Sequence, residues 1–232
     1  MTQSYVELCA EGRTLAGGVR IGHPGRGWGY WPLFTICQLL RLRWSIRISG
    51  AEHVQRGPAI LIGNHLSLLD PVFVGLSRTW RLTFFTKIEA FERRGGWFFW
   101  STGQIPLRRG DELATRWALA MSAWALKFGN ILAIYPEGTR SPDRVSLHRL
   151  HRRVLIPVLQ ANPDVPVHVV AIAYPGTQRG RRRVDIRVSP PLTLDISSDD
   201  PQQLTDTVTK ALLALGGMPY VHEFAREMKA RT

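Results

Sequence analysis

The stretch AILIGNHLSLLDPVF, residues 59–73, combines an apolar run, a polar turn and a helix start. Its first residues are apolar and rich in β-branched side chains, as in a buried strand. Asp70 followed by Pro71 marks a helix start, with Asp70 as the expected cap and Pro71 at the first helical position. The stretch therefore predicts a strand, a loop that carries His65, and a helix.

Similar apolar runs recur along the chain between helical patterns, which is typical of an α/β fold. Strands are expected at residues 44–49, 58–63, 82–86, 104–107, 131–135, 167–173 and 183–188. Helices are expected after Asp111 and Asp200, which are good N-caps. We predict a single α/β domain over residues 44–232, with a mixed central sheet flanked by helices.

Residues 1–43 are expected to form an N-terminal membrane-interface segment. Its charge-free part, residues 27–40, is shorter than the roughly 20 apolar residues that a transmembrane helix needs. Aromatic residues at one end and arginines beyond the other favour an amphipathic helix lying in the interface. A buried N-terminal helix is the alternative. Because no secretory signal is recognisable, we expect a peripheral protein at the cytoplasmic face of the membrane.

The chain has 232 residues and a formal net charge of +12, from 30 Lys and Arg against 18 Asp and Glu. Such a surface suits nucleic acid, an anionic membrane or an acidic carrier protein. Residues 188–232 carry four basic and six acidic side chains, so the basic surface should belong to the body of the domain. Two cysteines cannot form a disulfide framework.

His65 and Asp70 form the first candidate pair for chemistry. On an ideal helix their five-residue offset would turn them about 140° apart, whereas in a loop they can face each other. A carboxylate bonded to one imidazole nitrogen orients the ring, and the other nitrogen can then take a proton from a hydroxyl. The pair predicts a general-base dyad, with a capped loop of no catalytic role as the alternative.

Two further predicted strands end in polar, basic segments, at the position where α/β proteins bind ligands. PEGTRS, residues 136–141, follows one strand, and GQIPLRRG, residues 103–110, contains another. They offer a glycine that permits close approach, a hydroxyl and arginines that can fork onto a phosphate: Gly138, Thr139, Arg140, Arg108 and Arg109. Together the three strand ends predict a site for an anionic substrate that carries a nucleophilic hydroxyl.

The blocks NHLSLLD, IPLRRG and YPEGTRS resemble, in order and spacing, those of the lysophosphatidate acyltransferase family, the 1-acylglycerol-3-phosphate O-acyltransferases and their glycerolipid-acyltransferase relatives. The resemblance covers roughly residues 45–190. It implies that His65 deprotonates the acceptor hydroxyl, that Asp70 orients His65, and that the hydroxyl attacks an acyl thioester directly. It also implies a set of substrate-binding residues: Asn64, Arg109, Glu137, Gly138, Thr139 and Arg140.

The implied partners are an acyl-CoA or acyl-carrier-protein donor, a lysophospholipid acceptor and an anionic membrane surface, with no cofactor. Acylation of the sn-2 hydroxyl of 1-acylglycerol 3-phosphate would give phosphatidic acid. The chain departs from the family pattern at residues 141–157, SPDRVSLHRLHRRVLIP, so a lyso-ornithine lipid, a glycolipid or another lysophospholipid stays open as acceptor. A non-catalytic basic membrane-binding protein is the alternative from another class.

Two further basic patterns suggest no other chemistry. His148 and His151 are flanked by arginines with no neighbouring carboxylate or thiolate, so a metal site is not expected. RGRRR, residues 179–183, is expected to be a hairpin loop that is either solvated or in contact with lipid head groups. Nucleic acid is not expected as a partner, because no stacking platform, helix-turn-helix or zinc-ligand pattern accompanies these arginines.

Overall fold

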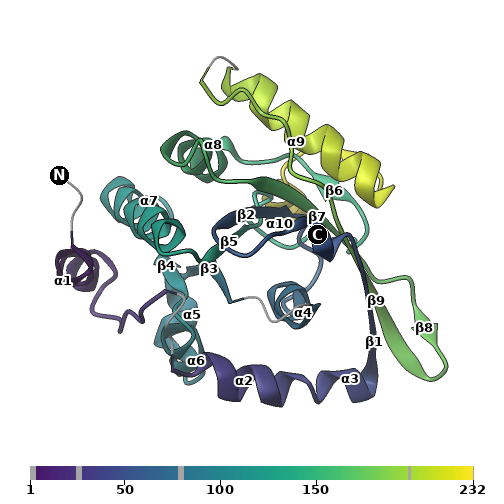
Figure 1. The fold of residues 1–232 in the computed structure, drawn as a ribbon, viewed down its shortest axis with the longest axis horizontal. Coiled ribbons are helices and arrows are strands. Elements are labelled where there is room, and N and C mark those ends of the chain that lie inside the picture. The colour runs from purple at the N-terminus through teal and green to yellow at the C-terminus, as the bar shows by residue number, and fades with distance from the viewer. Residues whose placement is uncertain (1–3, 25–27, 78–80, 198–199, 232) are drawn as a thin grey trace.

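A computed structural model describes residues 4–24, 28–77, 81–197 and 200–231. It shows a central sheet with helices on both faces (Figure 1). Each described helix is too short or too polar to cross a lipid bilayer.

The central sheet of the described residues has the strand order β1-β9-β7-β2-β5-β3-β4, with β8 beside β9. Its strands are β1 (Trp44–Ser49), β2 (Ala59–Gly63), β3 (Leu82–Lys87), β4 (Ile105–Leu107), β5 (Ile131–Ile134), β7 (Val167–Ala173), β8 (Thr177–Gln178) and β9 (Arg181–Val188). Every strand expected from the sequence is present, with ends shifted by at most two residues.

The pairing makes the sheet mixed, as predicted. Strands β7, β2, β5, β3 and β4 pair in parallel, whereas β9 runs antiparallel to β7. Because the carboxyl ends of parallel strands meet at one edge, the loops after β2, β4 and β5 emerge together. That edge carries the three blocks identified in the sequence.

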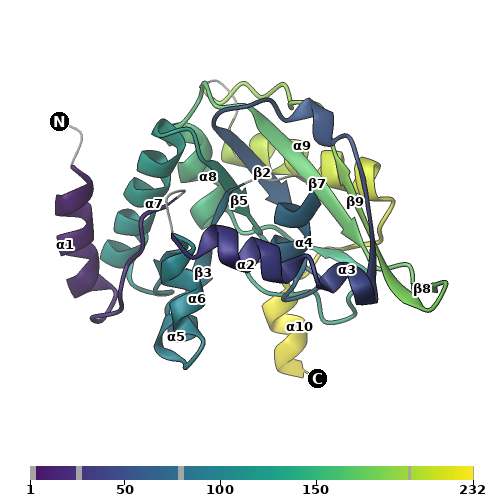
Figure 2. The ribbon, with the colours of Figure 1, turned by 60° about the horizontal axis from the view of Figure 1, so that its bottom comes forward.

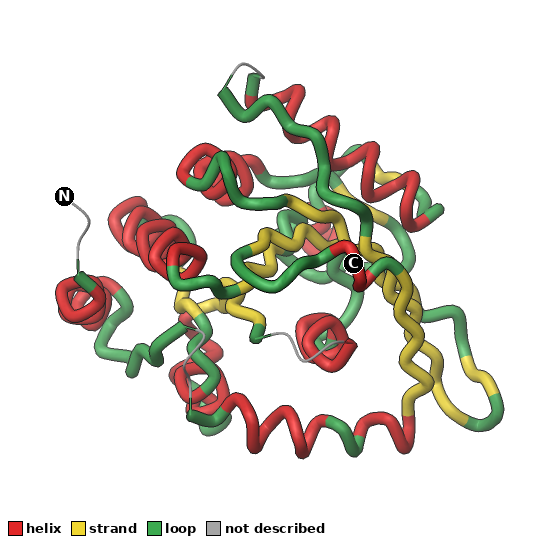
Figure 3. The backbone as a smooth tube through the Cα atoms, viewed as in Figure 1, coloured by secondary structure: helices red, strands yellow, loops and turns green. Residues whose placement is uncertain are grey.

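Helices surround this sheet, as the red segments of Figure 3 show. They are α1 (Tyr5–Leu15), α2 (Tyr30–Cys37), α3 (Leu40–Arg43), α4 (Asp70–Ser77), α5 (Ile88–Glu92), α6 (Gly96–Ser101), α7 (Glu112–Lys127), α8 (Arg152–Ala161), α9 (Pro201–Gly216) and α10 (Ala225–Arg231), with a 3-10 turn η1 (Ala51–His53). The caps predicted for α7 and α9 are confirmed, since Asp111 accepts the amide of Ala114 and Asp200 accepts the amide of Gln203.

The core follows the two-residue period of the strands. In β2, Ile60 and Ile62 pack in the cluster that contains buried residues of α8 and α9. Ala59 and Leu61 point to the other face, where they belong to the cluster with Phe73 of α4. β2 is buried throughout, so its end is a rigid support for the loop that follows.

The N-terminal segment divides into two parts. Helix α1 packs on α7, where Leu8 is buried and its carbonyl accepts the indole N–H of Trp117 at 2.6 Å. Helices α2 and α3 run along the periphery (Figure 1), and neither has a buried residue. Of the stretch expected to form an interfacial helix, residues 27–40, Gly27 lies outside the described residues, and the helix found within the stretch is α2.

A second, small sheet joins the C-terminal part of the chain to the segment that follows PEGTRS. Strand β6 (Leu147–His148) pairs in parallel with β10 (Tyr220–Val221). From there the chain enters α10, which projects from the same side of the molecule as α5 (Figure 2). The RGRRR hairpin is confirmed in part, because Arg179 and Gly180 form the positive-φ turn while the next three arginines lie in β9.

Candidate functional site

His65 and Asp70 face each other across the loop that follows β2. The distance from His65 Nδ1 to Asp70 Oδ2 is 2.8 Å. The His65 side chain is 19% exposed, while that of Asp70 is fully buried. The ring of His65 also lies 4.8 Å from that of Tyr135, measured between centroids. The arrangement predicted for the dyad is therefore present, with the histidine accessible and the carboxylate beneath it.

The Asp70 carboxylate does not cap helix α4 as the sequence suggested. It points back to the preceding loop, where Oδ2 also accepts the backbone N–H groups of Leu66 and Ser67, each at 2.7 Å. Oδ1 accepts the hydroxyl of Tyr174 at 2.5 Å. A buried carboxylate needs such donors, because it has lost its water shell. These bonds fix Asp70 relative to His65.

Tyr174 is a site residue that the sequence analysis missed. It follows β7, whose carboxyl end lies beside that of β2. Burial, and next the negative charge of Asp70, raise the pKa of the Tyr174 hydroxyl well above its usual value, so this group stays a hydrogen-bond donor. No local pattern indicates this contact, because 104 residues separate Tyr174 from Asp70.

Glu137 lies beneath the site and not on its surface. Its Oε1 accepts the backbone N–H of His65 at 2.7 Å, and its Oε2 accepts that of His148 at 3.0 Å. The side chain is buried, and desolvation raises its pKa to about 8. The amide of Ser141 in turn donates to the carbonyl of His65 at 2.7 Å. Thus the PEGTRS loop holds the backbone of the histidine, and the carboxylate of Glu137 is not placed to bind a phosphate as expected.

Asn64 also differs from its expected substrate-binding role. Its side chain is buried and bonds the backbone of Ile172 in β7 twice, with Nδ2 donating to the carbonyl at 2.9 Å and Oδ1 accepting the amide at 2.8 Å. The ladder between strands ends here, and the backbone polar groups at its end need other partners. Asn64 therefore ties the start of the His65 loop to the sheet.

The remaining predicted binding residues lie at the surface of the same edge. Arg109 donates from Nη2 to the carbonyl of Gly138, which joins the second and third blocks. Gly138 has a φ of 68°, and a Cβ there would approach the ring of His151 to 3.0 Å. Thr139 is partly exposed and Arg140 is exposed. These residues are accessible to an anion.

Three cations that the sequence analysis did not assign to the site lie near these residues, namely Lys87, Arg226 and Lys229. Lys87 ends β3, and its pKa is lowered first by burial and then by the charges of Arg109, Arg226 and Arg140. Lys229 donates to the hydroxyl of Thr139 at 3.3 Å. Residues 188–232 are close to neutral in sum, but α10 brings two of their cations, Arg226 and Lys229, to the edge of the sheet that carries the three blocks. This edge is called the active edge below. Helix α10 therefore adds cations to the basic surface that the sequence assigned to the body of the domain.

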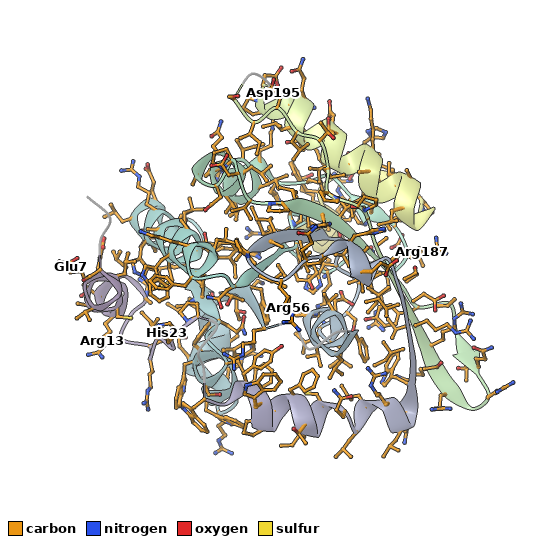
Figure 4. All side chains as sticks on the ribbon, viewed as in Figure 1. Glu7, Arg13, His23, Arg56, Arg187 and Asp195 are labelled. Atoms are coloured by element: carbon orange, nitrogen blue, oxygen red, sulfur yellow. The ribbon has the colours of Figure 1, made fainter. Side chains whose placement is uncertain are left out.

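An apolar groove begins beside the dyad. It lies between α2, α4, β3 and α6, and Pro71, next to Asp70, is among its lining residues. Side chains occupy much of the space between the α2 and α4 ribbons (Figure 4). Its walls are mainly apolar, including Leu33, Phe34, Leu76 and Phe84. Such a groove suits an alkyl chain.

No group of three or more His, Cys, Asp or Glu side chains in the described ranges is arranged to hold a metal ion. His148 is buried in β6, and His151 stacks on Phe224 with a centroid distance of 4.2 Å.

Comparison with known proteins places this site in a family. The Acyltransferase family model matches residues 45–174, which is more than half of the chain and contains all three blocks. The chain is 33% identical over 103 residues to the chloroplastic 1-acyl-sn-glycerol-3-phosphate acyltransferase LPAT1 of Arabidopsis thaliana. That match covers 43% of this chain but only 29% of the curated relative's length.

A solved structure shares the fold. The crystal structure of PlsC, the 1-acyl-sn-glycerophosphate acyltransferase of Thermotoga maritima, superposes with a TM-score of 0.62. The match covers 88% of this chain and 80% of that one, at 22% sequence identity. The mixed α/β architecture is therefore that of PlsC. From the family model that spans the three blocks, we conclude that this chain is an enzyme of the acyltransferase family.

Proposed function

We propose that this acyltransferase moves a fatty acyl chain from acyl-CoA or acyl-carrier protein to the sn-2 hydroxyl of 1-acylglycerol 3-phosphate, giving phosphatidic acid. The observation that carries the proposal is the His65–Asp70 pair at a sheet edge that also presents Arg109 and Arg140. The relative from Arabidopsis thaliana and PlsC are both named as acyltransferases of this acceptor, which supports the substrate class.

The proposed reaction uses His65 as the general base. Its Nδ1–H donates to Asp70, which leaves Nε2 as the nitrogen that takes the proton of the acceptor hydroxyl. The hydroxyl oxygen then bonds to the thioester carbonyl carbon, the carbon–sulfur bond breaks, and the departing thiolate takes the proton from His65. Asp70 stabilises the imidazolium that exists between these two transfers.

The surroundings of the dyad suit the two substrates. Arg109 and Arg140 can bind the acceptor phosphate, since guanidinium groups pair with phosphate oxygens in a bidentate manner. The groove beside Pro71 can take an alkyl chain of either substrate, because its walls are mainly apolar. An acceptor other than 1-acylglycerol 3-phosphate remains the second candidate, because residues 141–157 depart from the family pattern.

A thiol-release assay with a panel of acceptors tests this proposal. We expect the enzyme to release CoA from acyl-CoA in the presence of 1-acylglycerol 3-phosphate and much less with 1-acylglycerol or a lyso-ornithine lipid. His65→Ala should lower turnover by about 10²- to 10⁴-fold, the usual contribution of a general base. His53→Ala is the matched control, because His53 lies in η1 at the opposite edge of the sheet.

Two results would contradict the proposal. Clear preference for an acceptor without phosphate would refute the substrate assignment. A folded His65→Ala variant with turnover close to that of the wild type would refute the dyad.

We also propose that α2 and α3 lie against an anionic membrane surface at the cytoplasmic face, where acidic lipids attract basic segments. Leu39 and Leu42 are 63% and 72% exposed, and Trp28 is 67% exposed. Arg43 is exposed on the same segment. Apolar and aromatic side chains mixed with arginine are typical of a helix that lies in the interface.

A further inference from the structure

The segment that departs from the family pattern receives the C-terminal part of the chain. Its strand β6 pairs with β10, and the amide of Leu147 donates to the carbonyl of Pro219 at 2.9 Å. The amide of Arg149 donates to the carbonyl of Glu223 at 3.1 Å. The unusual sequence after PEGTRS thus forms a docking strand for residues that lie more than 70 positions later.

Aromatic contacts then hold the start of α10 against the site loop. The ring of His151 stacks on Phe224 with an interplanar angle of 2°, and the guanidinium of Arg149 lies over the same ring, 4.9 Å from its centroid. The amide of His151 donates to the carbonyl of Pro136 at 2.7 Å. Phe224 is therefore linked through one residue to the PEGTRS loop.

Helix α10 carries two cations from this anchor to the active edge. Lys229 reaches the Thr139 hydroxyl at 3.3 Å, and Arg226 lies close enough to act electrostatically on Arg109 and Lys87. Glu89 and Glu227 are acidic neighbours of this group, and the buried Glu137 also acts on Lys229. Because the pKa of Glu137 is raised to about 8, it is mostly neutral near pH 7, and positive charge remains in excess. Like charges gathered at one surface repel each other, and a bound anion relieves that repulsion.

We infer that Arg226 and Lys229 bind the phosphate monoester of the lysophospholipid acceptor, so that α10 forms one wall of the acceptor site. The inference rests on the proposed function and adds residues that lie outside the three blocks and outside the family-matched region, residues 45–174. It also gives a role to residues 141–157, which depart from the family pattern, because their strand β6 positions α10.

The covalent structures of the two substrates indicate that the phosphate bound by Arg226 and Lys229 belongs to the acceptor and not to CoA. In 1-acylglycerol 3-phosphate the reacting hydroxyl and the phosphate stand on neighbouring carbons, so the phosphate must bind near His65. The phosphates of CoA lie a whole pantetheine arm away from the thioester. Thr139, which contacts Lys229, lies between Glu137 and Ser141, the two residues that bond the backbone of His65.

Steady-state kinetics of Arg226→Ala, Lys229→Ala and the double variant test the inference. Acyl-pantetheine serves as the donor in one series, because it has no phosphate monoester, and acyl-CoA serves in the other. We expect the KM for 1-acylglycerol 3-phosphate to rise about tenfold for each removed cation in both series. Lys229→Arg should restore most of the acceptor affinity, since it keeps the charge.

Arg231→Ala is the matched control. Arg231 lies on the same helix but pairs with Glu223 at 2.9 Å, so its removal should leave the acceptor KM unchanged. Glycerol 3-phosphate provides a readout without turnover, and we expect it to raise the Tm of the wild type more than that of the double variant.

An unchanged acceptor KM in the double variant would overturn the inference, as would a rise confined to the KM for acyl-CoA, which would assign these cations to the donor. Both results leave the proposed function intact provided that the wild type still prefers the phosphorylated acceptor. Loss of that preference in the wild type would instead refute the proposed function.

Discussion

Replacing Glu137 with glutamine changes one buried group while keeping its shape. In the folded protein the carboxyl has a pKa of about 8, raised mainly by desolvation from an ordinary value of 4.5. Between these two pH values the unfolded chain releases a proton that the folded protein retains. Stability contributed by the neutral carboxyl is therefore fully present below pH 4.5 and is lost as the pH rises to about 8.

The structure sets the size of this effect. A difference of one pKa unit corresponds to about 1.4 kcal/mol. The rise of the Glu137 pKa from 4.5 to about 8 on folding therefore changes the free energy of unfolding by at most about 5 kcal/mol. Glutamine does not titrate, but its NH2 group cannot accept a backbone N–H. One of the two amides, of His65 or His148, then loses its partner at a cost of about 1–3 kcal/mol.

Urea unfolding at pH 5.5 and pH 8.5, followed by tryptophan fluorescence, measures the difference in unfolding free energy between Glu137→Gln and the wild type at each pH. We expect Glu137→Gln to be less stable than the wild type at the lower pH, and the gap to narrow or reverse at the higher pH. Glu112→Gln is the control, because Glu112 is exposed on α7 and pairs with Arg116. The acceptor KM of Glu137→Gln should stay within about twofold of the wild type, since this carboxyl lies beneath the site.

Two outcomes would refute this reasoning. A stability difference between Glu137→Gln and the wild type that is the same at both pH values would show that Glu137 does not titrate from a raised pKa. A large rise in acceptor KM, with folding preserved, would return Glu137 to the substrate-binding role that the family resemblance implied.

Two further predictions concern the dyad support and the membrane surface. Tyr174→Phe removes a donor from the buried Asp70 carboxylate, so we expect a loss of about 1–3 kcal/mol in unfolding free energy together with a lower kcat. An unchanged kcat would mean that Asp70 keeps its position without this bond. Replacing Leu39 and Leu42 with serine should weaken flotation with anionic vesicles at least tenfold, since a buried leucine contributes about 1.5–3 kcal/mol. Leu113→Ser, at 63% exposure on α7, should bind vesicles normally, and equal weakening there would contradict the location of the membrane surface.

The site shows how far local patterns reach. His65 and Asp70 are five residues apart, so the loop between one strand and one helix was enough to predict their contact. The roles of Asn64 and Glu137 were not predictable in the same way, because their partners are backbone groups brought close by folding. From the motif alone a buried carboxylate and one that faces substrate look the same.

By itself, the sequence determined the seven longer strands of the central sheet, the caps of α7 and α9, the mixed α/β class and the three blocks that lead to the acyltransferase family. These features depend on short-range periodicity and on residue types within a few positions of one another. Only the tertiary structure decided that Tyr174 supports Asp70 and that α10 brings Arg226 and Lys229 to the active edge. Those contacts join residues about 90 or more positions apart, and which side chains meet over such distances depends on the order of strands in the sheet and on the docking of β10 on β6.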